Sequence, residues 1–246
     1  TAMVATGDIN ELMEIFVKTR KQFSDHLVGF EIMPRIAVEI ALEYDNELKD
    51  PFSTKHDWYG LIELNAANKD LDLISPVADF LESSPCQSKI AADEFESAAL
   101  WAIRHALPKA QDKKGASIKN DVSLPLNRMS EFLLQATQQV KQRMPSVIVC
   151  SYGHAGDGNV HFNLTQPPGM GIQEFNGLQA EFNKIVHDIV HSMNGSIAAE
   201  HGVGQLKSEE LKHYMNPVEY QMMKMIKRTF DPENLFNPHK VIKMED

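Results

Sequence analysis

Short apolar runs alternate with longer amphipathic segments along this chain. The runs have the length of strands, and several of them, such as 117–124, alternate polar with apolar residues, which is the period of a strand. The pattern predicts strands at 2–5, 27–33, 57–64, 87–92, 117–124, 147–150, 160–164 and 195–199.

Helices are predicted between these runs. Asp8 is placed to cap a helix that ends near Phe23, because apolar residues from Ile9 onward recur on one face. Pro34 and Pro76 stand at helix starts, where proline is tolerated. Further helices are predicted at 36–44, 93–107, 126–143, 172–193 and over most of the tail from 208 onward.

The strands predict the fold class. Short strands with one polar face favour an antiparallel sheet with helices on one face over a buried parallel sheet. We therefore expect an α+β fold of ferredoxin-like type, with a helical C-terminal extension. The segment 110–118 has the composition of a linker, and we expect it to form a loop within one domain.

Composition excludes several classes of protein. The 246 residues carry 24 basic and 34 acidic side chains, a formal net charge of −10, which offers no positive field for nucleic acid or an anionic membrane. The chain contains no run of 18 apolar residues, so no transmembrane helix is predicted, and we identify no signal peptide. Cys86 and Cys150 are far apart, which favours a reducing compartment without disulfides.

The densest chemical signal is the segment Tyr152-Gly153-His154-Ala155-Gly156-Asp157-Gly158-Asn159-Val160-His161-Phe162-Asn163. Its glycines permit a tight turn between two strands, and a histidine stands on each side of that turn. A strand–loop–strand path can bring both imidazoles onto one centre, and imidazole is the commonest ligand of zinc-like ions. The pair predicts a metal site. A phosphate loop is disfavoured, because no helix start follows the glycines.

A second signal is Gly195-Ser196-Ile197-Ala198-Ala199-Glu200-His201-Gly202-Val203-Gly204. A strand here would send adjacent side chains to opposite sides, so Glu200 and His201 should have different tasks. Glu200 can complete a His/His/carboxylate site with open positions, as catalytic metals require. His201 would then be free for proton transfer.

Together the two motifs resemble the C-terminal domain of FAD-linked oxidases. This is the family of D-lactate, D-2-hydroxyglutarate and glycolate dehydrogenases within the vanillyl-alcohol-oxidase-like flavoproteins. Further matches follow in the family's order: Leu100-Trp101-Ala102-Ile103-Arg104, Lys119-Asn120-Asp121-Val122-Ser123-Leu124-Pro125 and Phe230-Asp231-Pro232-Glu233-Asn234-Leu235-Phe236-Asn237-Pro238. The resemblance spans essentially the whole chain.

The resemblance implies a division of the protein. Residues 1–246 would be the cap domain with the substrate and metal site, and 195–246 would return towards the flavin domain. No segment resembles the glycine loop that holds the flavin pyrophosphate, so we expect the N-terminal FAD-binding domain to be absent and this chain alone to be inactive. Implied cofactors are FAD and a divalent metal, zinc first. Implied partners are a small 2-hydroxy acid, the FAD-binding domain and a second copy in a homodimer. The implied location of the protein is the cytoplasm, and any contact with a membrane would be made through the electron acceptor.

The resemblance also implies roles for individual residues. The metal ligands would be His154, His161 and Glu200, and the base would be His201. Arg104, Lys119 and Asn163 would hold substrate carboxylate or hydroxyl groups, and Asn237 would face the flavin.

The sequence leaves the substrate and two other functions open. Pro108 stands where the hydroxyglutarate branch has a small hydroxyl residue, so lactate-like and malate-like acids remain alternatives to 2-hydroxyglutarate. A metal-dependent hydrolase could use the same His/His/Glu site with His201 as base. A non-catalytic binding module with a structural metal would also fit, and a closed four-ligand site would favour it.

Overall fold

The described residues of this protein form one sheet of seven strands, and every strand pair in it is antiparallel. The computed structural model describes residues 1–68 and 71–244, and within them the strand order is β4-β1-β3-β2-β6-β7-β5. The strands are β1 Ala2–Thr6, β2 Leu27–Pro34, β3 Trp58–Leu64, β4 Gln87–Ile90, β5 Ser117–Ser123, β6 Ile148–His154 and β7 Asn159–Thr165. The helices are α1 Ile9–Phe23, α2 Arg35–Tyr44, α3 Ile74–Glu82, α4 Glu94–Lys114, α5 Met129–Arg143, α6 Ile172–Asn176, α7 Gln179–Ser192, α8 Ser208–Tyr214 and α9 Pro217–Phe230.

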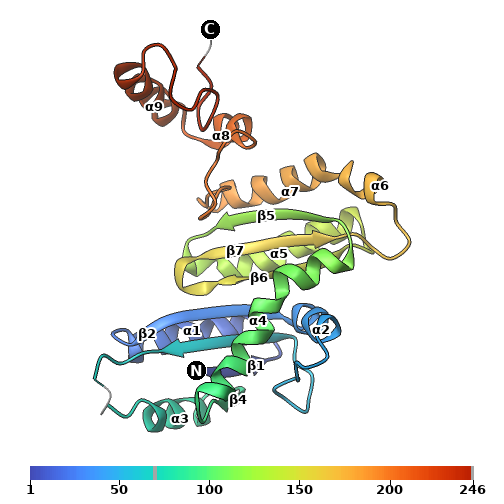
Figure 1. Ribbon diagram of the computed structural model, residues 1–246, viewed down its shortest axis with the longest axis vertical. Coiled ribbons are helices and arrows are strands. Elements are labelled where there is room, and N and C mark those ends of the chain that lie inside the picture. The colour runs from blue at the N-terminus through green and yellow to red at the C-terminus, as the bar shows by residue number, and fades with distance from the viewer. Residues whose placement is uncertain (69–70, 245–246) are drawn as a thin grey trace.

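The sheet consists of two halves that meet along a short seam. Strands β4, β1, β3 and β2 form one half, and β6, β7 and β5 form the other (Figure 1). Between β2 and β6 only two residue pairs are in register, Glu31 with His154 and Ile32 with Gly153. The α4 helix runs across both halves (Figure 1). Side chains from distant parts of the chain are therefore brought together at this seam.

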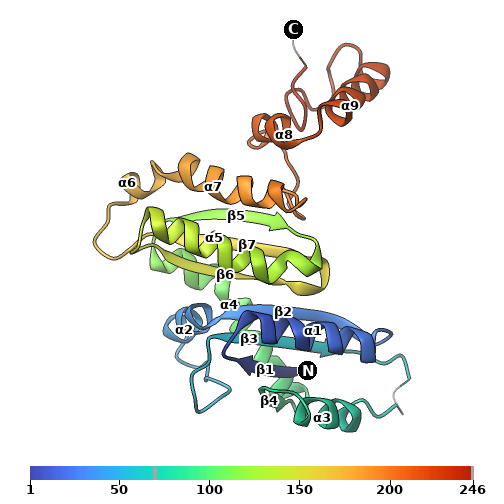
Figure 2. The same cartoon turned by 180° about the vertical axis from the view of Figure 1, so that it is seen from behind.

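Each face of the sheet has its own core. One core contains the apolar sides of α1, α3, α5 and α7, and the reverse view shows α1 and α5 lying over this face (Figure 2). The second core lies between the other face and the pair α2 and α4, around residues such as Tyr59, Leu107 and Tyr152. Successive side chains of a strand point to opposite faces of the sheet, so each strand contributes to both cores. In β2, for example, Phe30 and Ile32 lie in the first core and Met33 lies in the second.

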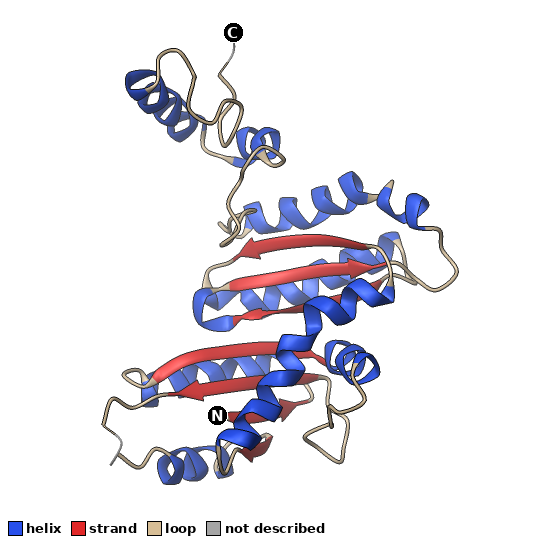
Figure 3. Cartoon of the chain, viewed as in Figure 1, coloured by secondary structure: helices blue, strands red, loops and turns tan. Residues whose placement is uncertain are grey.

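The predicted α+β class and antiparallel sheet are confirmed, and helices and strands alternate in the expected order (Figure 3). The helices cover both faces rather than one, because α2 and α4 bury the second apolar face. The α4 helix continues past Pro108 to Lys114, so most of the expected loop at 110–118 is helical. Its continuation buries Ala110 and Gln111, which offsets the hydrogen bond that proline removes.

One predicted strand is wrong. At 195–199 the chain makes a single bridge, between Ser196 and Ser123, and then turns. Ala199 has φ of +37°, which no strand accommodates. The predicted helix at 172–193 is divided into α6 and α7 at Gly177 and Leu178.

The C-terminal extension is helical, as expected, and lies beyond the layers of the sheet (Figure 1). It contacts α7 through α8, where Tyr214 donates a hydrogen bond to Asp188 at 2.8 Å. The α9 helix leaves large apolar side chains exposed, among them Met222, Met225 and Phe230.

Candidate functional site

The β6–β7 hairpin places His154 and His161 beside each other. His154 is the last residue of β6, and His161 lies opposite Tyr152 in the register of the hairpin. The two imidazole centroids are 5.6 Å apart. The turn requires Gly158, whose φ is +71° and where a Cβ atom would lie 2.2 Å from the carbonyl oxygen of Leu124. The prediction that glycine permits a tight turn in this motif is thus confirmed at Gly158.

Glu200 and His201 reach the same cluster from one turn. They do not project to opposite sides of a strand, because no strand forms there. The Glu200 Oε1 atom lies 4.0 Å from Nε2 of His154 and 3.7 Å from Nε2 of His201. The predicted projection of Glu200 and His201 to opposite faces of a strand is therefore wrong, although the two residues do meet the histidines of the hairpin.

These residues fit a divalent metal. One donor atom from each of His154, His161 and Glu200 lies within 4.8 Å of the others. Zinc binds imidazole nitrogen and carboxylate oxygen at about 2.0–2.2 Å, which places tetrahedral donors roughly 3.3 Å apart, so a small contraction would complete the site. Two imidazoles and one carboxylate leave at least one position open, as in catalytic zinc sites.

Behind His154 lies a buried carboxylate that the sequence reasoning missed. Glu31 Oε1 is 2.5 Å from Nδ1 of His154, and Glu31 Oε2 accepts from Nε of Arg104 at 2.6 Å. Burial acts to raise the pKa of Glu31, but His154 and Arg104 outweigh it and hold the pKa below its usual range. The hydrogen bond to Glu31 raises the pKa of His154. In the sequence, the signal for a functional Glu31 is that this acidic residue interrupts the apolar run that forms β2.

A second carboxylate, Asp121, lies behind His161 and His201. Its Oδ1 is 2.5 Å from Nδ1 of His161, and its Oδ2 is 2.8 Å from Nδ1 of His201. Burial acts to raise the pKa of Asp121, but the two histidines outweigh it and the net pKa is lowered. Asp121 lies in one of the motifs that carry the family resemblance, but the resemblance implies a substrate-binding role for Lys119 in that motif and none for Asp121.

The candidate substrate groups lie around this cluster. Arg104 is buried on α4, with its guanidinium carbon 4.6 Å from the centroid of the Tyr152 ring. Asn163 is buried and donates to Gln111 at 2.9 Å, while its Oδ1 atom has no hydrogen-bond partner within the described residues. Lys119 lies opposite Asn163 in the β5–β7 register, and its amine donates to Asp112 at 3.1 Å. Lys119 and Asn163 thus share the face of the sheet that carries His161, and Arg104 approaches that face from α4.

A known family matches nearly the whole chain. The model of the C-terminal domain of FAD linked oxidases matches residues 1–241. The chain belongs to this family. In this chain, His154, His161 and Asn163 share one face of the sheet, and α4 places Arg104 over that face.

Curated relatives carry names that specify a substrate. The chain is 31% identical over 247 residues to the D-2-hydroxyglutarate–pyruvate transhydrogenase of Saccharomyces cerevisiae, covering 96% of this chain and 49% of the relative. It is 29% identical to the D-2-hydroxyglutarate dehydrogenase of Stutzerimonas stutzeri, covering 98% of this chain and 52% of the relative. It is 28% identical to the mitochondrial D-2-hydroxyglutarate dehydrogenase of Arabidopsis thaliana, covering 98% and 42%. The chain therefore spans about half the length of these relatives.

Solved structures support the fold. The chain resembles p-cresol methylhydroxylase with a TM-score of 0.68 at 13% identity, covering 98% of this chain and 52% of the other. It resembles 4-ethylphenol oxidase from Gulosibacter chungangensis with a TM-score of 0.64 at 11% identity, covering 100% and 54%. In the described part of the chain, no helix is long and apolar enough to cross a membrane.

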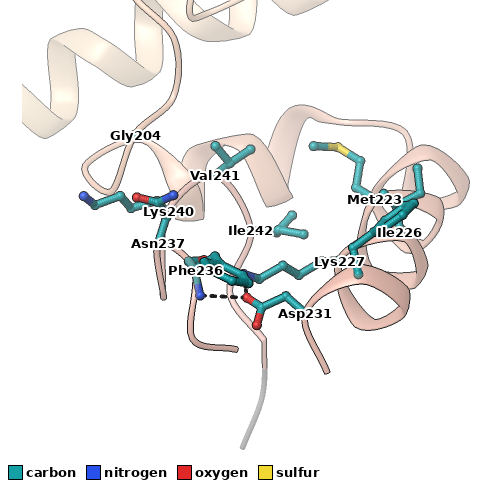
Figure 4. A pocket seen from close by; sticks show the side chains of 11 residues that line it. Gly204, Met223, Ile226, Lys227, Asp231, Phe236, Asn237, Lys240, Val241 and Ile242 are labelled. Atoms are coloured by element: carbon teal, nitrogen blue, oxygen red, sulfur yellow. Dashed lines mark hydrogen bonds and ion pairs between the residues drawn. The ribbon is translucent and has the colours of Figure 1, made fainter. Parts of the chain in front are cut away.

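Asn237 is not brought to the histidine cluster. It has φ of +47° and lines a groove of about 720 Å³ between α9 and the tail, as Figure 4 shows. The groove is lined by Ile226 and also by Lys227 and Asp231, which form an ion pair (Figure 4). The expected approach of Asn237 to a flavin remains a prediction.

Proposed function

We propose that this chain is the substrate- and metal-binding half of an FAD-dependent dehydrogenase that oxidises a D-2-hydroxy acid to a 2-oxo acid. The observation that carries the proposal is the convergence of His154, His161 and Glu200 beside the buried Arg104. Family membership supports the flavin link, and the names of the relatives favour 2-hydroxyglutarate over lactate or malate.

The substrate carboxylates would meet fixed positive charge and amide groups. The Nε atom of Arg104 is engaged by Glu31, so its terminal nitrogens remain to bind a carboxylate in fork geometry. Lys119 and the unpartnered Oδ1 of Asn163 would meet other polar groups of the substrate. Because Glu31 and Tyr152 hold Arg104 in place, little side-chain entropy would be lost on binding.

His201 would accept the proton of the substrate hydroxyl. Asp121 engages Nδ1 of this ring, so Nε2 is the atom that can accept a proton, and it lies 3.7 Å from Oε1 of Glu200. The hydroxyl would thus be deprotonated beside the metal ligands.

His154, His161 and Glu200 would hold the metal, whose charge lowers the pKa of a bound hydroxyl. The flavin, when bound, supplies the acceptor for the hydride from C2. Loss of the hydride and the hydroxyl proton converts the 2-hydroxy acid into the 2-oxo acid. This chain contributes the binding, the orientation and the proton acceptor.

The remaining assignments are proposals of the same kind. We propose that residues 1–246 form one cap domain, that 195–246 faces an FAD-binding domain, and that two copies form a homodimer. The exposed apolar side chains of α9 support a docking role for that segment. A cytoplasmic location is a prediction, and the Arabidopsis relative is mitochondrial by name.

The test is an assay with the flavin half present. The chain joined to its FAD-binding half should reduce a dye acceptor with D-2-hydroxyglutarate, and D-lactate and D-malate should be compared at equal concentrations. The chain by itself should neither retain FAD nor turn over these acids. Ester or amide hydrolysis by the isolated, metal-loaded chain would favour a hydrolase instead, and absence of any 2-hydroxyacid oxidation by the joined protein would reject the proposal.

A further inference from the structure

One carboxylate, Asp121, contacts two imidazoles of the candidate site. Asp121 and His161 face each other in the register of β5 and β7, while His201 arrives from the turn after residue 199. Each carboxylate oxygen is used once, by Nδ1 of His161 at 2.5 Å and by Nδ1 of His201 at 2.8 Å. The two rings stack at an interplanar angle of 27° with centroids 5.8 Å apart.

This arrangement dictates which nitrogen of each ring carries hydrogen. An ionised carboxylate only accepts hydrogen bonds, so both Nδ1 atoms must donate. In a neutral imidazole the other nitrogen, Nε2, then carries a lone pair. A lone pair on Nε2 suits His161 for binding a metal ion and suits His201 for accepting a proton.

A metal ion does not explain the contacts of Asp121 equally well. Asp121, His161 and His201 also have donor atoms within 4.8 Å of one another. However, two ligand atoms at about 2.0–2.2 Å from one zinc ion are roughly 3 Å or more apart. The 2.5 and 2.8 Å separations are those of short hydrogen bonds.

We propose that Asp121 is a positioning residue that sets the same Nδ1–H tautomer on His161 and His201, and so couples a metal ligand to the general base. The inference rests on the proposed function for the roles of the two histidines. The tautomers themselves do not depend on turnover, so the two proposals can fail separately.

The first measurement uses the 246-residue chain without metal. Two-dimensional ¹H–¹⁵N spectra of the imidazole rings, recorded at alkaline pH, report which nitrogen is protonated. His161 and His201 should both carry hydrogen on Nδ1. An Nε2–H form for either ring in the unmodified chain would overturn the proposal without any variant.

The second measurement uses Asp121→Asn. The amide can accept from one imidazole, but its NH₂ group must donate to the other, so one ring should change to the Nε2–H tautomer. Affinity for Zn²⁺, measured by calorimetry, should fall by roughly 10–100-fold, the usual effect of losing an outer partner of a metal-binding histidine. The matched control is Asp157→Asn, which removes an exposed charge from the turn of the β6–β7 hairpin and should leave tautomers and affinity unchanged.

The outcomes separate the possible explanations. Unchanged tautomers and an unchanged Zn²⁺ affinity in Asp121→Asn would overturn the proposal. Equal losses in Asp121→Asn and Asp157→Asn would show that only net charge matters, which also overturns it. If Asp121→Asn does not fold, the spectra of the unmodified chain still decide. Expected tautomers in a protein without 2-hydroxyacid oxidation would reject the proposed function and leave the tautomer assignment intact.

Discussion

Glu31 accepts a hydrogen bond from Arg104 at 2.6 Å, although the two residues lie 73 positions apart and both side chains are buried. The second oxygen of Glu31 meets His154, so one carboxylate links a candidate metal ligand to a candidate substrate-binding arginine. Because β2 belongs to one half of the sheet and β6 to the other, this link also crosses the seam. A buried carboxylate that is paired with an arginine and a histidine depends on both partners.

Replacement of Glu31 by glutamine should therefore affect both sides of the link. The amide retains the size of the carboxylate but cannot accept from Arg104 and His154 together. We expect Zn²⁺ affinity to fall by roughly 10–100-fold, and KM for the 2-hydroxy acid to rise because Arg104 loses its fixed position. Calorimetry and steady-state kinetics measure the two effects. Glu39→Gln, which removes a carboxylate that pairs with Arg35 and Lys55, is the control. A rise in KM without any change in Zn²⁺ affinity would contradict the proposed link.

Removal of both hairpin histidines should abolish metal binding. The isolated chain should bind about one zinc-like ion per molecule, because the two His/His/carboxylate sets among the described residues share His161. The double variant His154→Ala, His161→Ala should retain none after dialysis, as measured by plasma emission spectrometry. Substitution of the exposed His105 provides the control. Equal metal content in the double variant and the unmodified chain would sink the assignment.

Glu200 and His201 should differ in what their loss removes. In the flavin-joined protein, His201→Ala should keep its metal and lose roughly 10²–10⁴-fold in kcat, the usual contribution of a positioned base. Glu200→Ala should lose metal and activity together. Metal release by His201→Ala would instead show that His201 is a metal ligand. The experiment distinguishes the two roles directly, because Nε2 of His201 lies 3.7 Å from Oε1 of Glu200, a proposed ligand.

The sequence allowed the hairpin and its histidines to be predicted because that information is local. Two strand-length runs flank a glycine-rich turn, and both histidines lie within one segment of 12 residues. Glu31 and Asp121 could not be assigned in this way. Their partners depend on which strands pair, and the pairing of β2 with β6 and β5 with β7 is a property of the whole sheet.

The wrong strand at 195–199 has a related cause. Ile197 and Ala198 are buried, as in a strand, but only Ser196 finds a partner on β5. A run of apolar residues indicates that a segment is buried, but it does not indicate whether a neighbouring strand is available to pair with that segment. The continuation of α4 past Pro108 is the opposite case, in which burial of Ala110 and Gln111 overrides a local helix breaker.

Gly153 should tolerate no side chain. A Cβ atom there would lie 2.3 Å from the carbonyl oxygen of Asn159 and 2.9 Å from Cα of Val160, both backbone atoms of β7. Gly153→Ala should destabilise the chain by roughly 1–3 kcal/mol through overpacking, and it should weaken Zn²⁺ binding because His154 is the next residue. Gly156→Ala, in the same hairpin but with open space around its Cβ position, is the matched control. Urea unfolding curves of the two variants give the comparison, and equal midpoints would contradict the steric argument.

His187 should make the chain less stable in mild acid. Its side chain is buried under α8, and burial, reinforced by Lys207, lowers its pKa to about 4. In the unfolded chain the imidazole would titrate near its ordinary value of about 6.5, so between these values the unfolded state binds more protons. The free energy of unfolding should therefore fall as the pH decreases from about 6.5 to 4, by at most roughly 1.4 kcal/mol per unit. The carboxylate of Asp188 acts in the opposite direction and raises the pKa of His187, but burial outweighs it.

The matched test of this prediction compares two glutamine variants. His187→Gln removes the titrating group, so its free energy of unfolding should decrease less steeply than that of the unmodified chain over this pH range. His105→Gln, at an exposed position on α4, should follow the unmodified chain. Urea titrations at half-unit steps from pH 7.5 to 4 give the three slopes. Because the folded pKa is the lower one, the unmodified chain must lose stability relative to His187→Gln as the pH falls. A difference between the two free energies of unfolding that is constant with pH would show that His187 contributes packing alone.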